Sequence, residues 1–344
     1  MTTLLINAPA LGHTFPHHPE HAGRVPAIMH LLEQQGILSD LSLFAPRLAT
    51  TEQVRRVHTE ELLGFIRYTS LHGGGRLDAD TYATMESYDL ALEAVGSACR
   101  GVDEIMTGQA DNGMVLVRPP GHHAEKKMFG GFCLFNNVAA AARHAQMAHG
   151  LKRVLVVDFD VHHGNGTQDI FYDDPSVLFI STHIYTGHFY PGTGGIREQG
   201  LGLGKGSTLN VPFPPGVGDQ GYAQAFNELI APAAAAFQPE FILVSAGYDA
   251  HWADPLASAG LSLTGYAHIA RTLVQMADET CRGRVLFILE GGYFLDALAG
   301  GVLNTLYALL HHDQIHDPLG PLNKPETNVT DLLSALKQLH LSGS

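Results

Sequence analysis

Short runs of β-branched and apolar residues alternate along the chain with longer segments rich in alanine, leucine and glutamate. The short runs predict strands and the longer segments predict helices. The predicted strands are residues 3–7, 114–117, 153–157, 177–181, 241–245 and 285–289, and the predicted helices are residues 88–106, 137–149, 222–237, 266–280 and 294–310. This alternation predicts a mainly parallel sheet. Because several strands are apolar at every position, helices should cover both faces of the sheet.

The composition supports one large folded unit. Of the 344 residues, 45% are hydrophobic and 16% are charged, which suits a sizeable core and argues against disorder. No repeat or linker divides the chain, so one domain is expected over residues 1–344. No apolar run is long enough to span a membrane and no leader is evident, so the expected location is cytoplasmic. The longest irregular stretch is expected at residues 190–218, either lining a site or as a surface connection.

Charge and cysteine content narrow the chemistry. The formal net charge of −14 disfavours direct binding to nucleic acid and favours cationic partners such as lysine-rich peptides or polyamines, although simple solubility explains it equally well. The three cysteines are widely spaced and form no CxxC pair, so neither a disulfide framework nor a thiolate metal site is expected. Any metal must therefore be held by histidine and carboxylate.

Unusual polar clusters follow the ends of four predicted strands. RPPGHHA follows residues 114–117, DFDVHHGNG follows 153–157, AGYDAHWADP follows 241–245, and EGGY follows 285–289. In open parallel sheets, ligands bind beyond the carboxyl ends of the strands. These four clusters are therefore expected to meet at one site.

Asp160 and His162 are two residues apart, so in an extended segment their side chains point to one side and can hold one ion, while His163 points elsewhere. Asp254 is the predicted third ligand. Two carboxylates and one imidazole leave positions open for water and substrate, which is typical of a catalytic site. Zinc is the first expectation, and Fe(II) or Co(II) also accept these ligands. A single D-x-H motif is by itself weak evidence for a metal site, because surface and capping roles explain most instances.

Three other residues supply candidate catalytic groups. Pro119 and Pro120 constrain the turn that carries His122 and His123, and His123 is the predicted general base. A merely hydrogen-bonded histidine pair is the alternative. The Tyr293 hydroxyl can stabilise an oxyanion opposite the metal, although an isolated tyrosine is more often a packed aromatic.

Read together, HPEHAGR, RPPGHHA, GGFCLFNN, DFDVHHGNGTQ, FYPGTG, GYDAHWADPLA and LEGGY closely resemble the histone deacetylase superfamily, class II in particular. That superfamily also contains acetylpolyamine amidohydrolases and bacterial deacetylase-like amidohydrolases. The resemblance implies an arginase-like three-layer α/β/α fold with a mainly parallel eight-stranded sheet. It also implies zinc on Asp160, His162 and Asp254, with Tyr293 polarising the substrate carbonyl.

Further roles come from the resemblance alone. It implies that His123 is the general base and acid, that His122 is hydrogen-bonded to Asp158, and that Asn165 orients His123. Substrate-binding positions implied by the resemblance are Gly131, Phe132, Tyr190 and the tunnel gate Leu261, which lies seven residues after the expected last ligand. A structural potassium ion is implied at Asp158, Asp160, His162, Ser181 and Thr182. Arg24 matches a residue of an internal channel, and a salt-bridged structural arginine is an equally good interpretation.

The expected activity is hydrolysis of N-acyl-lysine in proteins or peptides. An acetylpolyamine amidohydrolase is the first alternative: Leu261 argues against it, because polyamine-selective relatives carry glutamate there, whereas Asp78, Asp80 or Glu86 could favour it. A binuclear manganese ureohydrolase is disfavoured because Gly164 replaces the aspartate that would hold a second metal. A non-catalytic acyl-lysine binder is disfavoured by Tyr293. No membrane partner is expected, and the acyl group and a homo-oligomeric state stay open.

Overall fold

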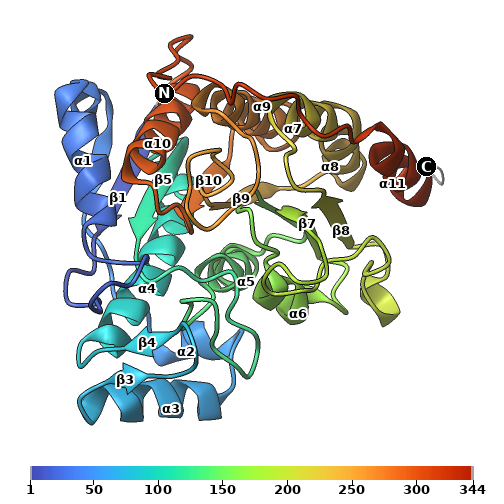
Figure 1. The fold of residues 1–344 in the computed structure, drawn as a ribbon. Helices are drawn as coiled ribbons and strands as arrows, with labels where there is room; N and C mark the ends of the chain where they lie inside the picture. Colours follow the sequence, from blue (N-terminus) through green and yellow to red (C-terminus); the bar gives the residue numbers. More distant parts are fainter. Residues whose placement is uncertain (1, 342–344) are drawn as a thin grey trace.

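A computed structural model describes residues 2–341, so residues 1 and 342–344 of the expected domain lie outside the described part. An eight-stranded sheet crosses its centre in the order β2-β1-β5-β10-β9-β6-β7-β8, and all neighbouring strands are parallel (Figure 1). Its strands are β1 (Thr3–Ala8), β2 (Ser42–Phe44), β5 (Asn112–Val117), β6 (Val154–Asp158), β7 (Val177–Ile184), β8 (Thr208–Phe213), β9 (Phe241–Ala246) and β10 (Val285–Leu289). The predicted parallel sheet is confirmed.

All six predicted strands form, and the two that the sequence did not reveal are the edges of the sheet. β2 has only three residues. In β8, Leu209, Val211 and Phe213 pack into the core while polar residues and Pro212 alternate with them. The expectation of an irregular stretch over residues 190–218 is wrong in this part, because Pro212 is tolerated in an edge strand. A separate antiparallel pair, β3 (Gly75–Arg76) and β4 (Tyr82–Ala83), lies outside the main sheet.

Helices cover both faces of the sheet, as the apolar strands predict (Figure 1). Within β6, Leu155 and Val157 belong to one hydrophobic core and Val154 and Val156 to the other. The helical segments are α1 (Arg24–Gln34), η1 (Ile37–Asp40), α2 (Thr51–Arg55), α3 (Glu60–Leu71), α4 (Ser87–Met106), α5 (Asn137–His149), α6 (Asn165–Phe171), η2 (Gly202–Gly204), α7 (Asp219–Ala225), η3 (Phe226–Ile230), α8 (Ala231–Phe237), α9 (Leu263–Cys281), α10 (Leu295–Leu309) and α11 (Thr330–His340). Helices α1, α7, α9 and α10 pack against the first core, and α4 and α5 against the second.

Local signals explain where these helices begin and end. The Asn136 side chain accepts a hydrogen bond from the Ala139 N–H at the start of α5, and Gly150 ends that helix with φ 72°. The predicted helix over residues 222–237 is also present, but η3 interrupts it as a single π-helical segment between α7 and α8. A side-chain cap at its start and a left-handed glycine at its end therefore account for the bounds of α5.

Candidate active site

The four polar clusters follow β5, β10, β9 and β6, which are consecutive neighbours in the sheet. Their side chains therefore meet at the carboxyl edge, as the sequence predicts. A cavity of about 290 Å³ opens there. It is lined by Asp80, His123, Gly131, Phe132, His162, His188, Phe189, Tyr190, Leu256 and Tyr293.

Asp160, His162 and Asp249 form the group best placed to hold a metal ion. Their candidate ligand atoms all lie within 4.8 Å of one another. His162 Nδ1 lies 3.0 Å from Asp160 Oδ1 and 3.4 Å from Asp249 Oδ2. The buried Asp249 Oδ2 has no hydrogen-bond partner, and burial together with the charge of Asp160 raises the pKa of Asp249. A buried carboxylate oxygen that accepts no hydrogen bond, beside a second carboxylate and an imidazole, fits a divalent cation.

Asp254, the predicted third ligand, binds backbone N–H groups instead. Its Oδ2 accepts hydrogen bonds from the backbone N–H groups of Tyr293 (2.7 Å) and Phe294 (3.0 Å), and its Oδ1 accepts one from Leu256 (3.0 Å). It is absent from the Asp160 group among residues 2–341. The structure therefore favours Asp249 over Asp254, because Asp249 lies directly beyond the end of β9 whereas the chain has turned away by residue 254.

The prediction that Leu261 gates the tunnel is wrong. Leu261 is fully buried in the hydrophobic core and its backbone pairs with His251. The error follows from the choice of the last ligand, since seven residues beyond Asp249 lies Leu256, and Leu256 does line the cavity. The cavity residue at this spacing is again a leucine.

Glu290 and Asp158 hold the turn that carries the two histidines. Glu290 Oε2 accepts hydrogen bonds from the backbone N–H groups of Gly121 (2.6 Å) and His122 (3.1 Å). His122 Nδ1 donates to Asp158 Oδ2 at 2.9 Å. Burial alone would lower the pKa of His122, but Asp158 and Asp160 outweigh it and raise this pKa to about 10. The two carboxylates thus favour the protonated form of His122, whose ring centroid lies 4.0 Å from that of His123.

Hydrogen bonds also determine which nitrogen of His123 carries its proton. The Glu125 carboxylate can only accept, so the 2.8 Å contact with Asn165 Nδ2 fixes the orientation of that amide. Asn165 Oδ1 then faces His123 Nδ1 at 2.7 Å, and Nδ1 must be the donor. Nε2 keeps its lone pair. Burial and the charges of His122 and His162 hold the pKa of His123 well below its usual range.

Aromatic rings form the walls of the cavity. Tyr190 meets the His123 ring edge-on at 4.9 Å, and Phe132 meets Tyr293 at 5.7 Å. Phe189, which sequence reasoning missed, stacks on His162 with ring centroids 4.9 Å apart. Gly131, at φ 53°, allows the backbone to approach closely, because a Cβ there would lie 2.3 Å from His123 Cδ2. Its carbonyl accepts a weak hydrogen bond from the Cys133 thiol at 3.3 Å.

Tyr293 is half-buried and lines the cavity, and burial raises its pKa well above 10, so its hydroxyl stays neutral. Arg24 lies behind it, with its guanidinium 5.1 Å from the centre of the tyrosine ring. Arg24 donates to the backbone carbonyls of Gly292 (2.8 Å) and Glu290 (2.6 Å) and pairs with Glu20 at 3.2 Å. These contacts fit the structural alternative for Arg24, while a channel role stays a prediction.

The groups expected to hold potassium lie together where β6 ends beside the middle of β7. Asp158 and Ser181 are paired in register, and the Thr182 hydroxyl donates to the Asp158 carbonyl at 3.3 Å. Gly164 lies against them, since a Cβ at this position would be 2.2 Å from Asp158 Oδ2. A larger residue at 164 would therefore displace Asp158. His163 points away as predicted, with Nδ1 2.8 Å from Thr193 Oγ1.

Asp103, His144 and His149 form another group with metal-ligand spacing, on α4 and α5. Both histidines place Nε2 at 2.7 Å from Asp103 Oδ1. His144 Nδ1 faces two donors, Gln53 Nε2 at 3.3 Å and Arg56 Nη1 at 3.5 Å. His144 must then carry its proton on Nε2, so this nitrogen has no lone pair for a metal. The group is a hydrogen-bonded cluster.

Comparison with known proteins agrees with this geometry. The histone deacetylase domain family matches residues 18–309. The chain belongs to the histone deacetylase family. It is 40% identical to "Histone deacetylase 14, chloroplastic" of Arabidopsis thaliana, over 96% of this chain and 83% of that protein. The crystal structure titled "HDA15 HD domain" superposes with a TM-score of 0.91 at 37% identity, over 99% of this chain and 96% of that chain.

Another histone deacetylase relative bears on substrate. The chain is 39% identical to "Polyamine deacetylase HDAC10" of Homo sapiens, over 92% of this chain and 48% of that protein. The arginase-like α/β fold predicted from the motifs is confirmed by the superposition. Among residues 2–341, no helix has the length and apolar character needed to cross a membrane. Because one relative is named chloroplastic, a cytoplasmic location stays a prediction.

Proposed function

We propose that this chain is a zinc-dependent deacylase that hydrolyses the amide of N-acyl-lysine in proteins or peptides to a free amine and a carboxylate. The observation that carries the proposal is that the metal-ligand group of Asp160, His162 and Asp249 reaches one cavity through His162. His123 and Tyr293 line the same cavity. A mononuclear site with open positions, a base and a neutral donor is the set that amide hydrolysis needs.

His123 and Tyr293 carry the proton and charge movements in this proposal. A divalent ion held by the three ligands would supply the Lewis acid that activates water and polarises the carbonyl. His123 Nε2 takes the proton of the attacking water and later gives it to the leaving amine. The neutral Tyr293 hydroxyl donates to the carbonyl oxygen as negative charge develops on it. His122 stays protonated beside Asp158, which favours neutral His123 before attack.

The choice of ions rests on the donor atoms. Two carboxylates and one imidazole suit zinc, and Fe(II) or Co(II) are also compatible with this set. For the structural potassium ion, the buried Asp158 carboxylate and the hydroxyl of Ser181, its register partner in β7, supply oxygen donors. The backbone carbonyls of Asp160, His162 and Thr182 would complete that proposed site.

An acylpolyamine is the second candidate substrate, because a polyamine deacetylase is among the relatives and Asp80 lies at the cavity. The uncharged Leu256 at the gate favours acyl-lysine instead. The test is hydrolysis of matched acetyl-lysine peptides and acetylated spermidine by the purified chain. Faster turnover of the peptides supports the proposal. Turnover of acetylated spermidine alone would instead make the chain an acylpolyamine deacylase.

Two remote alternatives find less support. A binuclear manganese ureohydrolase needs a ligand at position 164, and a side chain there would collide with Asp158. A non-catalytic acyl-lysine binder has no need of the hydrogen bonds that fix the tautomer of His123. Two manganese ions per chain with guanidine hydrolysis would establish the first alternative, and binding without turnover would establish the second.

A further inference from the structure

A second cavity, of about 400 Å³, opens beside the candidate active site and shares two wall residues, Asp80 and Phe132, with it. Neither the metal group nor the catalytic histidines touch it. We call it the flanking pocket. It is lined by Phe15, Pro16, His17, His18, Pro19, Arg76, Ala79, Asp80, Thr81, Tyr82 and Phe132.

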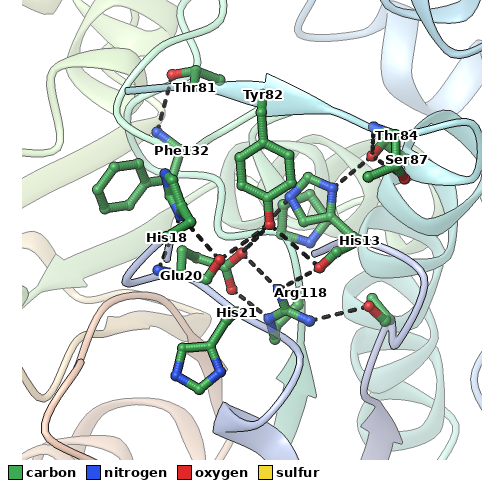
Figure 2. Close-up of polar contacts among 12 residues, drawn as sticks. His13, His18, Glu20, His21, Thr81, Tyr82, Thr84, Ser87, Arg118 and Phe132 are labelled. Carbon is green, nitrogen blue, oxygen red and sulfur yellow. Dashed lines mark hydrogen bonds and ion pairs between the residues drawn. The ribbon is translucent and has the colours of Figure 1, made fainter. Parts of the chain in front are cut away.

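His18 belongs to the lining of the flanking pocket and lies beside Tyr82 and Phe132 (Figure 2). The His18 ring meets Tyr82 at 4.7 Å and Phe132 at 4.6 Å, both nearly edge-on. Its Nε2 donates to the Asp80 carbonyl at 2.8 Å, and its Nδ1 accepts from the Glu20 N–H at 3.1 Å. Both ring nitrogens are occupied, so His18 joins the flanking pocket to the tunnel wall as a fixed part.

A buried ion pair between Arg118 and Glu20 supports these lining residues from behind (Figure 2). Arg118 binds the Glu20 carboxylate through Nε and through Nη2, the latter at 2.7 Å, and both side chains are fully buried. The Tyr82 hydroxyl donates to the Glu20 carbonyl at 3.0 Å. The Phe132 N–H donates to Thr81 Oγ1 at 3.2 Å. The flanking pocket is therefore formed before any ligand arrives, which lowers the entropy cost of filling it.

The chemistry of the walls points to an aromatic ligand. The half-buried Phe15 and Phe132 present rings, with Tyr82 buried behind them, and such rings pair favourably with another aromatic ring. Arg76 lies over the Phe15 ring at 5.6 Å, so a guanidinium is present at the wall. A guanidinium attracts aromatic faces and repels a cationic side chain. Burying a carboxylate among these apolar walls would cost its hydration, and Asp80 at the shared edge would repel it.

We propose that the flanking pocket binds an aromatic side chain of the residue next to the acyl-lysine in a peptide substrate. This inference rests on the proposed function. Neighbouring Cα atoms are about 3.8 Å apart, so a residue beside one seated in the tunnel can reach a pocket that shares its wall. A linear polyamine has no aromatic side chain to place there, and the flanking pocket gives its ammonium groups both Arg76, which repels them, and Asp80, which attracts them. The flanking pocket thereby favours protein substrates over polyamines.

The experiment compares kcat/KM for acetyl-lysine peptides that differ only in the residues before and after the lysine: phenylalanine, leucine, alanine or lysine. With the unaltered chain, phenylalanine on one side should exceed alanine by about tenfold, the scale of partial burial of an aromatic side chain, mainly through KM. Phe15→Ala and Arg76→Ala should each reduce that ratio. Tyr68→Ala, at an exposed site on α3, is the matched control and should preserve it.

A bare N-acetyl-lysine amide has no neighbouring side chain, so its hydrolysis tests the proposed deacylase activity without the flanking pocket. Phe15→Ala should hydrolyse it as fast as the unaltered chain does. Equal kcat/KM for all flanking residues, with the bare amide still hydrolysed, would overturn the flanking pocket and leave the proposed function standing. A ratio unchanged by both Phe15→Ala and Arg76→Ala would also overturn it. No hydrolysis of any acylated substrate would overturn the proposed function first.

Discussion

The Asp254 carboxylate accepts the backbone N–H of Tyr293 at 2.7 Å, and the same oxygen accepts the next N–H along the chain, from Phe294 at 3.0 Å. These two bonds fix the loop after β10 that carries the proposed oxyanion donor. Asp254 therefore acts through Tyr293 as a positioning residue. The neighbouring Asp249 leaves one buried oxygen without a hydrogen-bond partner.

Metal content should separate these two aspartates. Asp249→Asn should lower zinc affinity by at least about 100-fold, since loss of a mere supporting contact already costs 10- to 100-fold. Asp254→Asn should keep one zinc per chain. The asparagine amide has only one acceptor oxygen and cannot replace both carboxylate oxygens of Asp254. We therefore expect Tyr293 to shift and kcat to fall about 10- to 100-fold. Metal analysis and kcat are the measurements, and loss of zinc only in Asp254→Asn would restore the original assignment.

Tyr293→Phe removes the hydroxyl while keeping the ring. Turnover should fall about 100- to 1000-fold, the usual loss for one oxyanion donor, with zinc content and KM near normal. Tyr68→Phe removes an exposed hydroxyl and serves as the control, with no expected change. Steady-state kinetics on an acetyl-lysine peptide checks this, and undiminished kcat in Tyr293→Phe would remove Tyr293 from the mechanism.

Glu125→Gln tests the tautomer of His123. Glutamine can donate to Asn165, so the Asn165 amide is free to turn and present N–H to His123 Nδ1. We expect kcat to fall about tenfold or more while KM and zinc content hold, because general base catalysis needs the Nε2 lone pair. Asp169→Asn is the matched control: its carboxylate accepts the N–H of Lys126 at 2.9 Å in the same loop. Equal kcat in both variants would argue against the Glu125 contact.

His58 should make stability depend on pH. Its Nδ1 donates to the Glu125 carbonyl and its Nε2 accepts the Asn136 N–H, each at 2.8 Å, and burial lowers its pKa to about 4. In the unfolded chain the pKa of His58 is about 6.5, so between about pH 4 and 6.5 the unfolded chain binds a proton at His58 and the folded chain does not. Stability from His58 is therefore complete above about pH 6.5 and is lost as the pH falls towards 4, by up to about 3 kcal/mol.

Urea unfolding at about pH 7 and about pH 5 measures this loss. His58→Gln should be less stable at neutral pH and should lose less free energy of unfolding on acidification. His30→Gln, at an exposed position of α1, should keep the full pH dependence. If His58→Gln and the unaltered chain respond identically to pH, the buried neutral state of His58 is not the cause.

Much of the fold could be predicted from the sequence, because buried parallel strands are apolar at every position. The edge strand β8 was not predicted, because Thr208, Asn210 and Pro212 interrupt its apolar pattern. Caps such as Asn136 matched the predicted start of α5. Edges and short strands carry too few apolar residues to be distinguished from loops.

The site was predicted less completely, for a geometric reason. The two-residue spacing of Asp160 and His162 is enough to predict that they bind the same ion. Asp249 and Asp254 both follow β9, and the alternation of side chains along a strand does not predict which of them points to the metal site once the chain has turned. The gate moved with that choice, from Leu261 to Leu256. Glu125 carries no motif signal of its own, because its importance depends on the orientation of one amide.

The most direct test of the central claim is a zinc titration of the metal-free chain, with acetate release from an acetyl-lysine peptide as the readout. A mononuclear site at Asp160, His162 and Asp249 predicts that activity rises linearly and saturates at about one zinc per chain. Absence of acetate release at full zinc occupancy, or activity that appears only with a second equivalent, would contradict it.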